Sequence, residues 1–288
     1  MVRKTDWERD VVYLYQFPRA ACVPSISPYC FKLETWLRMA DIKYQNVKCG
    51  MTTRSARGQM PFIELNGEEI ADSYFIIRRL SEVFHKNLNE NLDESQKSQS
   101  YVYERLVEQS LVWAMQRDAT ANMPEMFKDE VMGKSLPSLV KIASPVLFWG
   151  LKRNMRNRQA AQGIGRYEDA EVQHFLESDL KALSLYLGKK PYFNGEAPTE
   201  LDTTVFGHLA IQWYLPFESR TKAFMAKECT NLVDFFERVK STFWPDWEDC
   251  TANLSLETDW KAPKKAADAE GKTAEGMEDA AAAATSKE

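Results

Sequence analysis

The first third of the chain alternates between short apolar runs and amphipathic segments. Residues 11–15 and 44–47 are rich in β-branched and aromatic side chains, which predicts two strands. A helix is predicted to begin near Pro28, because proline suits the first turn of a helix. Its apolar stripe, spaced three or four residues apart, is Leu33, Trp36, Leu37 and Ala40.

A third predicted strand leads into a hairpin. After Pro61, residues 62–65 alternate in pattern, and Asn66-Gly67 follows, a pair that tolerates the positive φ angles of a tight turn. Asp72-Ser73 then opens a helix, because both residue types cap helices. The predicted buried face of that helix holds Phe75, Ile76 and Leu80.

The part after residue 97 has helical periodicity throughout. Apolar side chains recur three or four positions apart along residues 103–114, 172–187 and 232–243. Between the last two segments, Thr199 and Asp202 have capping-box spacing and predict the start of another helix. These residues are predicted to serve folding rather than catalysis.

The boundaries follow from polar composition. Residues 1–9 are a charged N-terminal extension without the apolar core of a signal peptide, and residues 87–96 are a polar linker between two domains. Residues 251–288 are predicted to be a disordered tail rich in Ala, Lys and Glu, because aromatic and branched apolar residues are missing from about Lys261 onward. An apolar stretch at 136–151 meets a basic run at 152–158, which could contact an anionic membrane surface or be a solvated helix end.

Composition excludes several classes of function. The 288 residues carry a net charge of −5, which argues against nucleic-acid binding, and no apolar run is long enough to span a membrane. Five cysteines form no CxxC pair and only three histidines are present, so no metal site is predicted and a reducing, cytoplasmic location is expected.

Two stretches carry candidate binding chemistry. If the Met60-Pro61 bond is cis, the N–H and C=O of Met60 turn outward and can pair with an extended peptide ligand. Asp72 and Ser73 can offer hydroxyl and backbone N–H groups to a carboxylate at the positive end of their helix. Either feature alone is also explained by an ordinary turn or helix cap.

The order of elements and these motifs resemble the thioredoxin-like N-terminal domain of glutathione transferases. The resemblance implies an α/β domain at residues 10–86, followed by an all-helical domain at 97–250. It also implies that Met60, before a cis Pro61, pairs with the cysteinyl backbone of glutathione. Gln59 stands beside them in the matching stretch. Asp72-Ser73 corresponds to the pair that holds the γ-glutamyl end.

Ser27-Pro28-Tyr29-Cys30 resembles the Cys-Pro-Tyr-Cys redox site of glutaredoxins, with serine first. A dithiol exchange is therefore not expected, and Cys30 is more simply a packed hydrophobe. In omega-class transferases the residue before the proline is the nucleophilic cysteine. In theta- and delta-like enzymes a catalytic serine lies one residue earlier, where this chain has Ile26. Ser27, Ser25 and Tyr29 remain alternative candidates for activating a glutathione thiol.

Residues 27–37, 58–80 and 191–209 together resemble the failed axon connections proteins, a branch of the transferase fold related to metaxins. That resemblance implies a glutathione S-transferase-like protein with a role in axon and nervous-system development. The thiolate of glutathione would add to a small electrophile between the domains, where Tyr101 and Trp113 are candidate wall residues. Relatives commonly form homodimers. The alternative is a non-catalytic scaffold that binds a protein partner or a membrane surface in neurons.

Overall fold

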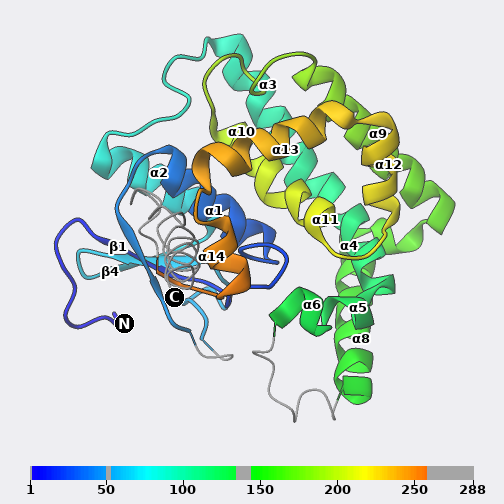
Figure 1. The fold of residues 1–288 in the computed structure, drawn as a ribbon, viewed down its shortest axis with the longest axis horizontal. Coiled ribbons are helices and arrows are strands. Elements are labelled where there is room, and N and C mark those ends of the chain that lie inside the picture. Colours follow the sequence, from blue (N-terminus) through cyan, green and yellow to red (C-terminus); the bar gives the residue numbers. More distant parts are fainter. Residues whose placement is uncertain (1, 50–52, 134–143, 258–288) are drawn as a thin grey trace, which may run out of the picture. The chain divides into compact units, whose positions relative to one another are not determined.

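The α/β part of the chain is a mixed four-stranded sheet with two helices. The computed structural model describes residues 2–49, 53–133 and 144–257. The sheet order is β2-β1-β3-β4, with β1 and β2 parallel and the other neighbours antiparallel (Figure 1). The strands are β1 (Val12–Tyr15), β2 (Tyr44–Val47), β3 (Phe62–Leu65) and β4 (Glu68–Ala71). The predicted strands and their order are confirmed.

The turn between β3 and β4 is the predicted hairpin. Leu65 pairs with Glu68 across a two-residue loop. Asn66 has a φ of 50° and Gly67 a φ of 82°, as a turn of this kind requires.

The two helices of this part begin where the sequence predicts. Helix α1 (Pro28–Met39) starts with proline, and α2 (Ser73–Phe84) follows Asp72. Ile76, Ile77 and Leu80 are buried on α2, whereas Phe75 is 50% exposed, so its predicted place on the buried face is wrong. Ile76, Ile77 and Leu80 form the buried face instead. The guanidinium carbon of Arg57 lies 5.0 Å from the centre of the Phe75 ring.

The remaining described chain is helical, as predicted. The first long helix is continuous from α3 through a π-helical segment, η1, into α4, and the buried central helix contains a second such segment, η4. The elements are α3 (Glu94–Arg105), η1 (Leu106–Leu111), α4 (Val112–Ala121), α5 (Met123–Met126), α6 (Asp129–Met132), α8 (Ser144–Gln162), η3 (Ile164–Arg166), α9 (Asp169–Leu187), α10 (Glu200–Val205), η4 (Phe206–Ala210), α11 (Ile211–Tyr214), α12 (Arg220–Glu228), α13 (Thr230–Phe243) and α14 (Trp247–Ala252).

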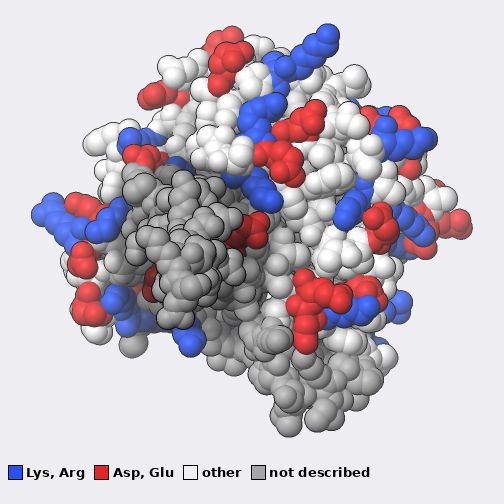
Figure 2. Space-filling model, in the orientation of Figure 1, with Lys and Arg blue, Asp and Glu red and all other residues white. Residues whose placement is uncertain are grey.

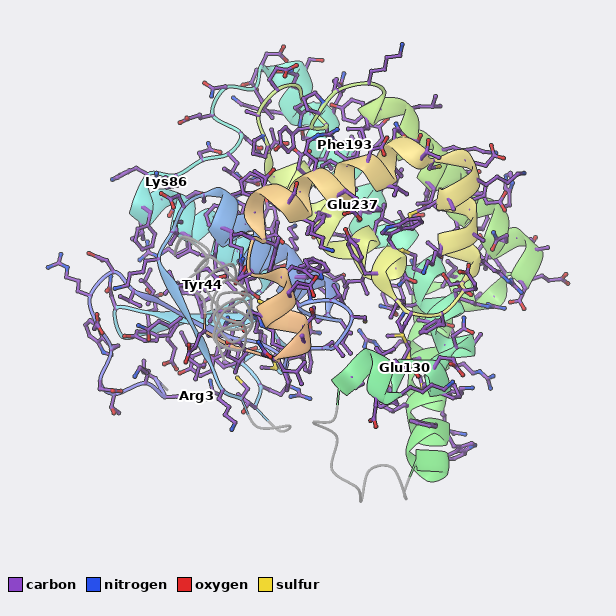
Figure 3. All side chains as sticks on the ribbon, in the orientation of Figure 1. Arg3, Tyr44, Lys86, Glu130, Phe193 and Glu237 are labelled. Carbon is purple, nitrogen blue, oxygen red and sulfur yellow. The ribbon has the colours of Figure 1, made fainter. Side chains whose placement is uncertain are left out.

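The predicted capping box at the start of α10 is confirmed. The N–H of Thr199 donates to Asp202 Oδ2 at 2.7 Å, and the N–H of Phe193 donates to Asp202 Oδ1 at 2.8 Å. Phe193, labelled in Figure 3, is fully buried. Its ring stands edge-on to Phe235 at 5.3 Å between ring centres. One carboxylate therefore joins the incoming loop to the helix that it caps.

Helix α1 packs into the helical part as well as against α2. Phe31 lies 5.0 Å from Phe206 and 5.1 Å from Trp244, ring centre to ring centre. Gly207 brings η4 against α1 so closely that a Cβ there would lie 2.6 Å from the Cα of Lys32. The first turn of α1 is thus positioned by both parts of the fold.

The predicted boundaries differ from the structure at two points. The last residues of the predicted linker at 87–96 already belong to α3. The predicted tail at 251–288 begins too early, because Thr251 is buried and the carbonyls of Ser255 and Leu256 accept hydrogen bonds from Arg19 and Asn46. The rest of that tail, and part of the apolar stretch at 136–151, lie outside the described residues.

The surface carries both signs of charge. Figure 2 shows lysine and arginine residues interspersed with aspartate and glutamate residues over the visible described surface. Several aromatic side chains are also exposed, with Trp149 of α8 at 66%.

Candidate functional site

Two of the three candidate hydroxyl residues, Ser25 and Ser27, lie in the turn that enters α1. Ser27 is the N-cap residue by its backbone angles, and its C=O accepts the first helical bond from Phe31 at 2.9 Å. Its hydroxyl makes no capping bond. Ser25 is fully buried, and its Oγ accepts from the N–H of Ser27 at 3.3 Å. Ser25 therefore shapes the turn, while Ser27 is half-buried at the positive end of α1, with its side chain within hydrogen-bonding range of the Cys30 thiol.

Cys30 lies behind this turn and is fully buried. It packs with Met60 and Phe62, so the Met60-Pro61 turn and the start of α1 are in contact. Burial raises the pKa of the Cys30 thiol to about 12. The thiol is therefore protonated at neutral pH and acts as a small core residue.

The Met60-Pro61 peptide bond is cis. Among the residues that the structure describes, no partner hydrogen-bonds to the N–H or C=O of Met60. The preceding loop is held by Ser55, whose N–H donates to the carbonyl of Gln59 at 3.1 Å and whose Oγ accepts from the N–H of Gln59 at 3.3 Å. Gln59 is exposed beside this free stretch of main chain.

Asp72 and Ser73 have different roles at the start of α2. Asp72, with a φ of 82°, is the cap, since its Oδ1 accepts from the N–H of Tyr74 at 3.0 Å. Ser73 is 6% exposed, and its hydroxyl has no hydrogen-bond partner within the described chain. The cap and a free hydroxyl thus stand side by side at one helix N-terminus.

Tyr29 connects this turn to the helical part. Its ring stands edge-on to His208 at 5.1 Å. Burial, followed by the carboxylates of Glu108 and Asp72, raises the pKa of Tyr29 to about 12. Arg105 and Arg158 act on the same hydroxyl in the opposite direction, so residues from α2, α3 and α8 lie within electrostatic range of α1.

The two predicted wall residues each lie under an arginine. Arg105 stands 5.7 Å above the ring of the exposed Tyr101, and Arg158 stands 5.9 Å above the half-buried Trp113. Sequence reasoning missed both arginines. They lie far from residue 29 in sequence. Arg158 was noted only as part of the basic run at 152–158, and nothing in the local pattern of Arg105 separates it from other surface cations.

A buried group of charged and polar residues lies between α1 and the helical part. Lys32 of α1 donates to Glu108 Oε1 at 2.7 Å, and both side chains are nearly inaccessible to water. His208 has Nδ1 at 2.8 Å from the carbonyl of Thr204, and burial lowers its pKa to about 4. Its Nε2 is buried and has no partner in the described part of the chain.

Glu108 and His208 lie on the π-helical segments η1 and η4. Such segments are rare and frequently occur at functional sites. Sequence reasoning also missed these two residues; the visible signal was a charged and a titratable residue within otherwise apolar helical stripes.

Two kinds of feature are missing from the described residues. They contain no group of histidine, cysteine or acidic side chains arranged to hold a metal ion. None of their helices is both long and apolar enough to cross a membrane.

Comparison with known proteins follows the same division of the chain. Residues 28–126 match the glutathione S-transferase N-terminal domain, and residues 176–239 match the glutathione S-transferase C-terminal domain. Failed axon connections of Drosophila melanogaster is 37% identical over 286 residues, covering 96% of this chain and 67% of that protein.

Two other relatives are more distant. Isoprene-epoxide–glutathione S-transferase of Rhodococcus is 26% identical, covering 81% of this chain and 99% of that protein. Metaxin-2 of Mus musculus is 25% identical, covering 84% of this chain and 91% of that protein.

Solved structures show the same fold at low identity. A β-etherase from Sphingobium has a TM-score of 0.55 at 14% identity, covering 84% of this chain and 98% of that chain. A glutathione S-transferase of Ceriporiopsis subvermispora in complex with glutathione also has a TM-score of 0.55 at 14% identity, covering 80% of this chain and 97% of that chain. The predicted architecture, a thioredoxin-like domain with a helical domain, is confirmed.

Proposed function

This chain belongs to the failed axon connections family, within the glutathione S-transferase superfamily, and we propose that it binds glutathione and conjugates its thiolate to small electrophiles. The observation that carries the proposal is the Ser27 hydroxyl, which stands at the N-terminus of α1 and makes no capping bond. The isoprene-epoxide–glutathione S-transferase of Rhodococcus, which is 26% identical to this chain, supports the same reaction class.

Glutathione would lie across the three converging segments. The free N–H and C=O of Met60 would pair with its cysteinyl backbone, next to Gln59 and Pro61. The Ser73 hydroxyl would donate to the γ-glutamyl carboxylate, and Asp72 would accept from its ammonium group. The thiol would then face the start of α1.

Ser27 would favour the thiolate. A glutathione thiol has a pKa near that of free cysteine, about 8.5, so only a small fraction is ionised at neutral pH. A hydrogen bond from Ser27 Oγ and the positive end of α1 stabilise the anion. Lowering the pKa by about two units needs roughly 2.7 kcal/mol of stabilisation. The proton leaves to solvent, and the sulfur attacks a carbon of the electrophile. As the C–S bond forms, a π bond or a bond to a leaving group at that carbon breaks, and its electron pair takes a proton from solvent or departs with the leaving group.

The electrophile would be bound on the side of Tyr29 that faces the arginines. Arg105, which is paired with Glu108, and Arg158, which has no ion-pair partner in the described chain, would form a partly aromatic wall with one uncompensated positive charge over the rings of Tyr101 and Trp113. Such a wall suits an electrophile that develops negative charge as the sulfur adds.

The experiment is conjugation rate against pH with a chromogenic electrophile. Wild type is expected to show an apparent pKa below 8, and Ser27→Ala to shift it upward and slow the reaction about tenfold or more at neutral pH. Ser25→Ala and Tyr29→Phe are the matched comparisons, since Ser25 is buried and the Tyr29 pKa is raised. An unchanged profile in Ser27→Ala would remove its catalytic role.

The second candidate function is a non-catalytic scaffold that binds a protein partner or a membrane surface in neurons. The exposed ring of Trp149 favours it, because Trp149 precedes the basic run at 152–158 on α8, and an aromatic side chain beside basic residues suits an anionic membrane surface. A wild-type rate equal to buffer, with no thermal stabilisation by glutathione, would support this candidate instead. A role in axon development is compatible with either.

A further inference from the structure

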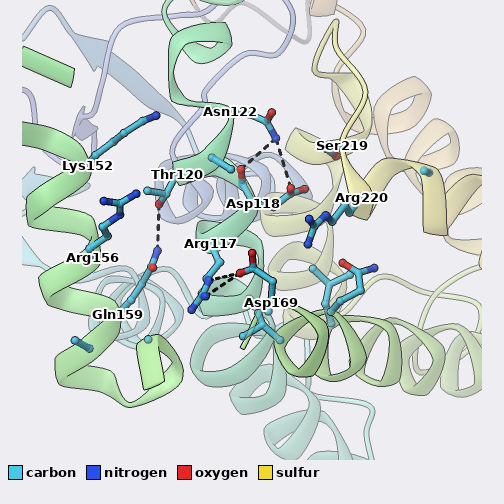
Figure 4. Close-up of a pocket in the computed structure, with 18 of the residues that line it drawn as sticks. Arg117, Asp118, Thr120, Asn122, Lys152, Arg156, Gln159, Asp169, Ser219 and Arg220 are labelled. Carbon is cyan, nitrogen blue, oxygen red and sulfur yellow. Dashed lines mark hydrogen bonds and ion pairs between the residues drawn. The ribbon is translucent and has the colours of Figure 1, made fainter. Parts of the chain in front are cut away.

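A cavity of about 950 Å³ lies within the helical part, among α4, α8, α9 and α12 (Figure 4). Its volume is within the range of small-molecule sites, about 300–1,000 Å³. It shares no lining residue with the site at α1, so its occupant would be independent of glutathione.

Hydrogen bonds and an ion pair hold part of the cavity wall in place. Gln159 is buried, and its Nε2 donates to Thr120 Oγ1 at 3.1 Å; that hydroxyl donates to the carbonyl of Gln116 at 2.6 Å. Arg117 is neutralised by Asp169, with Nε 3.0 Å and Nη2 2.8 Å from the same oxygen. These bonds fix the helices on which the remaining charged residues stand.

Three other cations line the space. Lys152 and Arg156 are one turn apart on α8, and Arg220 stands on the opposite side at the start of α12 (Figure 4). In the described chain none of the three has an ion-pair partner. Asp118 and Glu218 are the carboxylates left after the Arg117–Asp169 pair, so the cations are in excess. An anionic group is favoured here, near the positive end of α12.

The carboxylate of Asp118 places a second requirement on the ligand. Its Oδ1 accepts from Asn122 at 3.4 Å, whereas its Oδ2 is buried and has no partner among the described residues. Leaving a buried acceptor unpaired is costly, and a hydroxyl group of a ligand would satisfy it. The occupant should therefore carry both an anion and hydroxyl donors.

We propose that this cavity binds a small, hydroxylated phosphate monoester. A phosphate dianion offers oxygens to Lys152 and Arg156, which are one turn apart on α8, while Arg220 on the opposite side adds to the positive potential of the space (Figure 4). A hydroxyl of the same molecule donates to Asp118 Oδ2. A sugar phosphate has this chemistry. The same group occurs on phosphoinositide headgroups, but the volume, which is within the range of small-molecule sites, favours a free molecule.

The test is calorimetry on the full chain with glucose 6-phosphate, compared with glucose and with sulfate. Saturable binding is expected for glucose 6-phosphate, weaker binding for sulfate, which lacks hydroxyl groups, and none for glucose. Lys152→Ala and Arg156→Ala should each weaken binding of glucose 6-phosphate about tenfold or more, Arg220→Ala should weaken it less, and Asp118→Asn should reduce the preference over sulfate. Arg153→Ala is the matched control, because Arg153 is exposed on the same helix and covers Trp149 at 5.7 Å.

Three results would overturn the proposal. One is the absence of binding by glucose 6-phosphate. Another is an equal loss in Arg153→Ala and Arg156→Ala, which would indicate unspecific charge attraction. The third is binding to phosphatidylcholine vesicles that carry phosphatidylinositol phosphate, without binding of the free sugar phosphate. Ser27→Ala should bind the sugar phosphate as wild type does, so failure of the proposed conjugation reaction would leave this site unaffected.

Discussion

Glu34 holds several buried partners at the middle of α1. Its oxygens accept from Arg19 at 2.6 and 2.7 Å, from Tyr44 at 2.9 Å and from Gln16 at 2.7 Å. Burial alone would raise the pKa of Glu34, but the charges of Arg19 and Arg38 outweigh it and lower the pKa to about 2. The carboxylate is therefore ionised at every physiological pH.

Glu34→Gln is expected to destabilise the fold by about 3–5 kcal/mol at neutral pH, because two arginines lose their buried partner. The folded pKa is below the ordinary value of 4.5, so this stabilisation is present above pH 4.5 and is lost as the pH falls toward 2. Urea unfolding at a series of pH values measures both effects. The variant should lose less stability with acid than wild type, and Glu82→Gln, an exposed control, should match wild type within about 0.5 kcal/mol.

Ser73 and Asp72 allow binding and folding to be separated. Because Asp72 is the cap, Ser73→Ala should leave the melting temperature nearly unchanged and weaken glutathione binding about tenfold to a hundredfold. Asp72→Ala should lower both, since removing a cap costs about 1 kcal/mol. Calorimetry measures the glutathione affinity of each variant, and a melting curve measures its stability. A Ser73→Ala protein that binds glutathione normally would exclude the proposed hydrogen bond.

At the scale of elements, the sequence predicted those whose signal is local. Pro28, Asn66-Gly67 and the Thr199–Asp202 box each mark a turn or cap through their own chemistry, and the structure has all three. The π-helical segments η1 and η4 were not predictable, because one extra residue per turn changes an apolar stripe too little to be seen. Their positions depend on tertiary packing of Glu108 and His208 against α1.

Gly207 tests that packing. Gly207→Ala places a Cβ 2.6 Å from the Cα and N of Lys32, so backbone must move. We expect a loss of about 1–3 kcal/mol and weaker glutathione binding, because the first turn of α1 moves with Lys32. The control is Gly150→Ala on α8, where a Cβ would contact nothing within 4 Å. That change should stabilise the helix by about 0.5–1 kcal/mol. Equal stability of the two variants would contradict the close contact.

At the scale of the whole molecule, prediction succeeded for architecture and failed for how distant segments meet. Met60, Asp72 and Ser27 could be proposed because each lies in a recognisable motif. Arg105, Arg158 and the Lys32–Glu108 pair could not, since they join the site only through packing between the two parts. The predicted end at residue 250 was wrong for a related reason. The following residues attach through main-chain carbonyls, which no side-chain pattern reveals.

Two truncations measure that attachment. A chain ending at Glu257 keeps the bonds from Arg19 to Ser255 at 2.9 Å and from Asn46 to Leu256 at 3.2 Å, and should melt at the wild-type temperature. The residues that it lacks are almost devoid of large apolar side chains and have little to pack. A chain ending at Cys250 loses both bonds and the buried Thr251, and leaves the Arg19 guanidinium with fewer acceptors. At about 1 kcal/mol for each lost bond, melting should fall by at least about 4 °C. A fall of that size in the chain that ends at Glu257 would show instead that residues beyond 257 pack against the rest of the protein and stabilise it.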